Sequence, residues 1–193
     1  MLRTLNRRGH LMGMAAPLYY SADMVRALPD DGNRYETVHG ELLVTPVPRA
    51  LHQHIVKRLL VKLESYLERE SVGEVFHAPA DISWTDDTLV QPDLFVVDPR
   101  EARTLDWTHM KTLLLVIEVL SPSTSRGDRF TKRRLYQEQH VPLYWIVDAD
   151  QRQVEVWCPD LEFPETENER VLWLPEDAAS PFTLELNQLF KPL

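Results

Sequence analysis

Residues 90–135 constrain this chain most, because two apolar runs within them each carry an acidic side chain. Residues 91–97 contain Asp93, and residues 112–120 contain Glu118. Short runs rich in Val, Leu and Ile are typical of buried strands. A carboxylate in such a strand is unfavourable unless it is paired with a cation or binds a metal. The two carboxylates therefore mark a candidate functional site.

The spacing of apolar residues predicts the elements around this segment. Residues 49–69 are expected to form a helix, because Ile55, Leu59, Leu63 and Leu67 recur every four positions. Residues 35–38 and 41–45 flank a His-Gly pair, which predicts a β-hairpin. The other expected elements are a helix over 22–27 capped by Ser21, strands over 74–84, 143–147, 154–157, 170–174 and 182–186, and a helix from Asp128, as its cap, to Gln139.

This order of elements favours an α/β fold in which helices flank a mixed β-sheet, with the β-hairpin at the N-terminal end. A length of 193 residues is typical of one domain, expected over residues 19–193, and residues 1–18 are expected to be a basic disordered tail. No apolar run approaches the ~20 residues of a membrane span. The single cysteine, Cys158, is compatible with a reducing compartment, so a cytoplasmic location is expected.

The distribution of charge is uneven. The net charge is −9, which argues against a nucleic-acid coat protein or a membrane-surface protein. Residues 121–135, however, contain five basic residues and one acidic residue. This basic run could hold a phosphate backbone, or it could be the solvated face of a helix.

Three further residues are candidates for the site. Lys132 shares a helix face with Leu135 and Tyr136, so it is expected to point towards the sheet and a carboxylate or phosphate partner, unless it extends to the rim. His52 could transfer a proton or contact phosphate, or it could be a structural histidine. Glu41 could complete an acidic cluster, or it could be a solvated residue at a strand start.

The two central carboxylates also have structural interpretations. Asp93 could bond to a neighbouring loop, and Glu118 could form an ion pair with Arg126 or Arg129. These alternatives require no metal.

The combined pattern resembles the PD-(D/E)XK nuclease superfamily and, more narrowly, the Uma-two family of restriction endonucleases. The resemblance extends over about residues 20–157. The matching pieces are residues 35–42 (YETVHGEL), 48–52 (PRALH), 91–93 (QPD), 118–124 (EVLSPST), Asp128 with Lys132, and 141–148 (VPLYWIVD).

This resemblance implies a restriction-endonuclease-like core and Mg²⁺- or Mn²⁺-dependent hydrolysis of DNA, bound through its phosphate backbone. It implies that Asp93, Glu118 and the main-chain carbonyl of Val119 hold the metal. Such a metal activates water and neutralises developing negative charge. The superfamily's lysine two positions after the glutamate is replaced by Leu120, and in the Uma-two group a lysine of the following helix, here Lys132, is thought to substitute.

Two alternatives to an enzyme stay open, namely a catalytically silent nucleic-acid-binding or interaction module and an acidic scaffold without a nucleic-acid partner. A homodimer is also expected, because two-fold dimers are the commonest oligomers. Aromatic residues near the C-terminus could form the dimer interface or pack on the chain's own core. They are Trp157, Phe163, Trp173 and Phe182.

Overall fold

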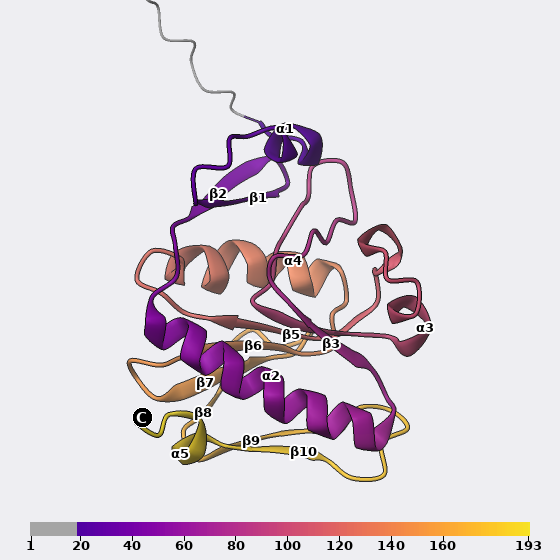
Figure 1. Ribbon diagram of the computed structural model, residues 1–193, viewed down its shortest axis with the longest axis vertical. Helices are drawn as coiled ribbons and strands as arrows, with labels where there is room; N and C mark the ends of the chain where they lie inside the picture. The colour runs from indigo at the N-terminus through magenta and orange to yellow at the C-terminus, as the bar shows by residue number, and fades with distance from the viewer. Residues whose placement is uncertain (1–18) are drawn as a thin grey trace, which may run out of the picture.

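A six-stranded sheet lies at the centre of the computed structural model, which describes residues 19–193 (Figure 1). The strand order is β3-β4-β5-β6-β7-β8, and every neighbouring pair is antiparallel except β5–β6. The sheet is therefore mixed, as predicted. Its strands are β3 (Glu74–His77), β4 (Leu94–Val97), β5 (Leu113–Val119), β6 (Tyr144–Asp148), β7 (Gln153–Trp157) and β8 (Glu165–Glu167).

One face of the sheet is covered by α2 (Ala50–Glu70), the longest helix in the described chain. Ile55, Leu59 and Leu63 project from α2 into the core with almost no exposed surface, as their spacing predicts. A second antiparallel pair, β9 (Arg170–Trp173) and β10 (Phe182–Glu185), packs into the same core with α5 (Leu186–Leu189). Figure 1 shows α2 and the β9–β10 pair on the same side of the sheet.

The opposite face carries a helix whose first part is π-helical. This segment, η2 (Gly127–Lys132), continues directly into α4 (Arg133–Glu138), which buries Leu135 and Tyr136. The prediction that Asp128 caps this helix is wrong. Helical structure begins two residues before Gly127, and the Asp128 amide already donates to the carbonyl of Thr124 at 3.0 Å.

The N-terminal elements form a separate projection, which we call the hairpin lobe (residues 21–45; Figure 1). It contains α1 (Ala22–Arg26), β1 (Arg34–Val38) and β2 (Glu41–Thr45). The turn residues His39 and Gly40 have φ values of 50° and 80°, the left-handed backbone that a two-residue hairpin loop requires. The lobe is attached by main-chain bonds between Thr37 and Leu89, both 2.8 Å long.

The segments that connect the main elements differ in secondary structure from the prediction. The strand expected over 74–84 ends at His77, and β8 was not predicted. The loop after β4 contains the short helices α3 (Pro99–Ala102) and η1 (Trp107–His109). The tail expected over residues 1–18 lies outside the described residues. Across residues 19–193, no helix has both the length and the apolarity needed to span a membrane.

The C-terminal aromatic residues do not form the surface proposed for a dimer. Trp157, Trp173 and Phe182 are at least 93% buried in the chain's own core. Phe163 is 73% exposed. Three of the four side chains therefore stabilise this fold, and the argument for a dimer through them is wrong.

Candidate functional site

The antiparallel register between β4 and β5 brings the two central carboxylates together. Leu94 pairs with Ile117, so Asp93, which immediately precedes β4, lies across from Glu118 near the end of β5. Both residues are almost fully buried, with exposed fractions of 4% and 1%. Strand pairing is therefore what brings the two carboxylates together.

Three donors surround the carboxylate of Asp93. Arg34 Nη1 donates to Oδ1 at 3.0 Å, and the Val119 amide donates to Oδ2 at 2.9 Å. His52 Nε2 lies 2.9 Å from the same Oδ2. Burial raises the pKa of Asp93, but the His52 hydrogen bond and the charge of Arg34 outweigh it and hold the pKa below its ordinary value.

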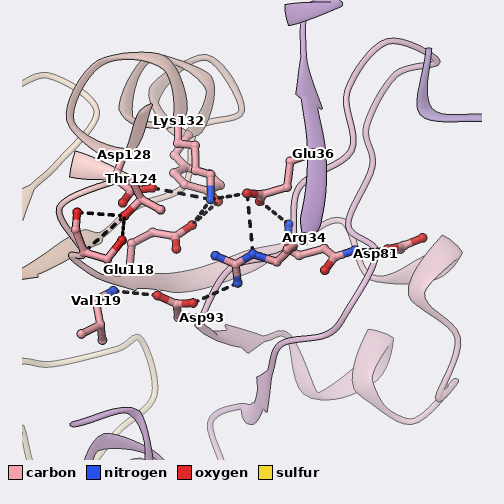
Figure 2. A network of polar contacts seen from close by, with 12 residues as sticks. Arg34, Glu36, Asp81, Asp93, Glu118, Val119, Thr124, Asp128 and Lys132 are labelled. Carbon is pink, nitrogen blue, oxygen red and sulfur yellow. Dashed lines mark hydrogen bonds and ion pairs between the residues drawn. The ribbon is translucent and has the colours of Figure 1, made fainter. Parts of the chain in front are cut away.

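Lys132 points into the protein, as predicted from its helix face. Its Nζ atom lies 2.9 Å from Glu118 Oε1, 2.9 Å from Glu36 Oε2 and 3.6 Å from Asp128 Oδ1 (Figure 2). Burial lowers the pKa of this ammonium group, but the three carboxylates outweigh burial and raise the pKa above its ordinary value. Leu120, at the position of the superfamily lysine, is buried among apolar residues.

Glu36 is the member of the cluster that the sequence analysis missed. It lies on β1 with no exposed surface, and its Oε1 accepts a 2.7 Å hydrogen bond from the Gln91 amide. Glu41, which was expected to complete the acidic cluster, is exposed at the start of β2 and pairs with Val38 across the hairpin. Its position within a predicted strand is a weak signal, because its polar neighbours in that strand do not indicate that Glu36 is buried.

The buried cluster contains more negative than positive charge. Four carboxylates stand against two cations, so with neutral His52 the formal charge of the ionised cluster is −2. The carboxylates are Glu36, Asp93, Glu118 and Asp128, and the cations are Arg34 and Lys132. Burial and the neighbouring carboxylates raise the pKa of Glu118 well above its ordinary value, and they also raise that of Asp128.

The carboxylate oxygens of this site are of the type that hard divalent cations prefer. Within residues 19–193, no three His, Cys, Asp or Glu side chains gather in a metal-binding arrangement. A metal would therefore need main-chain oxygen and water besides two carboxylates, which is how proteins commonly bind Mg²⁺. Within residues 19–193, Lys132 and Tyr136 both donate to Glu118 Oε1. Its Oε2, the Asp93 carboxylate and the Val119 carbonyl remain the candidate ligands.

The site opens into a cleft with a volume of about 780 Å³. Arg34, His52, Asp93 and Val119 line the cleft, whereas Glu36, Glu118 and Lys132 do not. A ligand in the cleft would therefore meet Asp93 and its donors before the lysine.

Most of the basic run is committed to internal contacts. Arg129 pairs with Asp148 at 3.1 Å and with Glu155 at 2.7 Å. Arg133 lies over the ring of Trp157, 4.6 Å from its centroid. The run therefore leaves two exposed arginines, Arg126 and Arg134, to contact a phosphate backbone.

Comparisons with known proteins agree with this architecture. The family model described as "Uma2: Putative restriction endonuclease" matches residues 22–187. A solved structure described as "a putative nuclease belonging to DUF820" from Anabaena variabilis ATCC 29413 superposes with a TM-score of 0.74. It is 20% identical, and the match covers 89% of this chain and 97% of that one. No curated protein matches the sequence.

The structural likeness establishes the fold, and it confirms the α/β architecture with a restriction-endonuclease-like core. The family match extends over most of the described chain and beyond the segment in which the resemblance was seen. It also includes every residue of the buried cluster. The chain is therefore a member of the Uma2 family.

Proposed function

We propose that this protein is a divalent-metal-dependent nuclease that hydrolyses phosphodiester bonds in DNA. The observation that carries this proposal is the buried Lys132, held 2.9 Å from two carboxylates beside Asp93, in a cluster with excess negative charge. Asp93, Glu118 and the Val119 carbonyl would hold Mg²⁺ or Mn²⁺. When bound, such an ion activates water and offsets negative charge on the phosphate.

The side chains around the proposed metal have distinct roles in this proposal. Lys132 supplies positive charge where the phosphate becomes more negative during hydrolysis. Glu36 acts as a positioning residue, because one of its oxygens contacts Lys132 and the other holds the Gln91 amide next to Pro92 and Asp93.

His52 is suited to move a proton. Its Nε2 is oriented by Asp93 at 2.9 Å, while its buried Nδ1 has no hydrogen-bond partner in the described chain. A ring with Nε2–H directed at a carboxylate leaves Nδ1 to accept a proton from water.

One observation favours a different function. Both oxygens of the Asp93 carboxylate already contact Arg34, His52 or the Val119 amide, so the cluster is also consistent with a structural polar core. In that case the protein would be a catalytically silent module that binds nucleic acid. Such a module would bind DNA in a salt-dependent manner without metal-dependent cleavage.

A cleavage assay with matched glutamate variants tests the proposal. Labelled single-stranded and duplex DNA would be incubated with Mg²⁺ or Mn²⁺ and wild-type protein, Glu118→Gln or Glu41→Gln. Glu118→Gln removes a buried charge in the cluster, and we expect cleavage to fall by a factor on the order of 10² or more. Glu41→Gln makes the same change at an exposed position and should cleave as wild type does. Equal cleavage by both variants would contradict the assignment, and no cleavage by wild-type protein would favour the silent module.

A further inference from the structure

The size of the cleft restricts what can reach the buried cluster. Its volume of about 780 Å³ is within the range of sites for small ligands. It is bordered by the hairpin lobe, the start of α2 and the loop at 121–124. A recess of this size accommodates a single nucleotide.

The charges lining the cleft do not suit a duplex. Three arginines and three aspartates line it, so the lining carries no excess of positive charge. Arg26 is paired with Asp81 at 3.3 Å, and Arg34 with Asp93 at 3.0 Å. Duplex-binding surfaces are strongly positive because they must neutralise many phosphates.

The rest of the lining has the two components that an unpaired nucleotide needs. Apolar side chains from the hairpin lobe, the following linker and α2 offer a surface for a base, and Val47 is 73% exposed there. These side chains are Val25, Leu28, Tyr35, Val47 and Val56. Hydroxyl groups line the cleft from the loop after β5, at Ser121, Ser123 and Thr124.

Two buried nitrogen atoms at the cleft, Arg34 Nε and His52 Nδ1, form no hydrogen bond within residues 19–193. Arg34 Nε lies 3.9 Å from Glu36 Oε2 in an ion pair, whereas no ion pair involves His52 Nδ1 in this part of the chain. Buried polar atoms usually have partners, so His52 Nδ1 indicates a ligand. An arginine N–H is a favoured donor to phosphate oxygen. Both residues also line the cleft next to Asp93.

From these observations we infer that the substrate is single-stranded DNA, and that one unpaired nucleotide enters the cleft. Its base lies against the apolar lining, and its phosphate lies at Arg34 and His52. Contacts between the base and the apolar lining, including the Tyr35 ring, contribute to binding together with the phosphate contact. This inference rests on the proposed nuclease function for the identity of the ligand.

Binding and cleavage measured separately distinguish this inference from the proposed function. Fluorescence anisotropy in EDTA would compare a labelled oligothymidylate with a blunt hairpin duplex, using the full chain as wild type, Val47→Glu or Val61→Glu. Val47→Glu places a negative charge at the cleft and should weaken single-strand binding on the order of tenfold. Val61, 60% exposed on α2, lies outside the cleft, and the same substitution there should leave binding unchanged.

We expect single-stranded DNA to bind at least tenfold more tightly than the duplex. Equal binding of both, no binding of either, or equal effects of the two valine variants would overturn the inference. Cleavage of duplex as fast as single strand would also overturn it, while leaving the nuclease function intact. Single-strand binding that depends on Val47 without any cleavage would support the inference and contradict the nuclease function.

Discussion

Replacing Lys132 with methionine should destabilise the protein strongly, because it leaves buried carboxylates without their central cation. The side chain is 2% exposed, and its ammonium group contacts Glu36, Glu118 and Asp128. Removing one partner of a buried ion pair costs about 3–5 kcal/mol. Since folded domains are stable by about 5–15 kcal/mol, this loss is a large share of the total. Methionine has a similar length, so the effect would come from charge rather than from a cavity.

The loss should depend on pH in a defined direction. Burial already raises the pKa values of Glu118 and Asp128, and removing the lysine removes the largest effect that lowers them. The folded variant would therefore hold protons that the unfolded chain releases above about pH 4.3, the ordinary glutamate pKa. The free energy of unfolding of the variant should therefore fall as pH rises above this value, by about 1.4 kcal/mol per pH unit for each extra proton that the folded state holds. The variant should be closest to wild type at pH 5 and furthest from it at pH 8.

Urea unfolding followed by tryptophan fluorescence at pH 5, 6.5 and 8 would measure this, since Trp145 is fully buried. Arg134→Met, at an exposed basic position, is the matched control and should change stability by less than about 0.5 kcal/mol. Adding Glu36→Gln to Lys132→Met should recover part of the loss, because it removes one negative charge and keeps an acceptor for the Gln91 amide. If Lys132→Met is as stable as Arg134→Met at pH 8, or equally destabilised at every pH, the reasoning about buried charge is refuted.

Three further predictions concern the metal, the oligomeric state and the packing of the fold. Calorimetric titration should detect Mg²⁺ or Mn²⁺ binding that Asp93→Asn and Glu118→Gln each weaken. Binding should strengthen as pH rises, because the raised pKa of Glu118 makes a proton compete with the metal. Unchanged binding by the double variant would place the metal elsewhere. Light scattering at micromolar concentration should give twice the monomer mass if the protein is a homodimer, and a monomer would remove that expectation. Gly73→Ala should lower the midpoint of unfolding, because an added Cβ would lie 2.6 Å from Val96 Cγ1. In the control Gly127→Ala the added Cβ meets no atom closer than 3.9 Å, so its midpoint should not fall. Equal midpoints for the two variants would show that β4 shifts to accept the added methyl group at little cost.

The parts of the fold that local sequence determines were predictable. The four-residue spacing of leucines defines α2, and the His-Gly turn defines the hairpin, because both depend on neighbouring positions. The inward direction of Lys132 also followed from its spacing to Leu135 and Tyr136. Each of these features is a short-range consequence of helix or turn geometry.

The features that depend on distant partners were not predictable. Glu36 is buried because Lys132 and the Gln91 amide meet it in space, and β1 alone gives no sign of either. Asp128 has the spacing of a cap, but its carboxylate faces Lys132 because the helix starts earlier, at the turn after Ser121. The π-helical turn likewise has no simple sequence pattern. Long-range contacts decided these points, as they commonly override local preference.

The buried cluster is assembled from segments that are far apart along the chain. Arg34 and Glu36 come from the hairpin lobe, Glu118 from the sheet, and Lys132 from the helix that follows it. None of these segments alone holds both the lysine and its carboxylate partners from β1 and β5. A newly synthesised or partly unfolded copy would therefore lack the proposed hydrolytic activity until the lobe has docked. Completion of folding would therefore be a condition for the proposed activity.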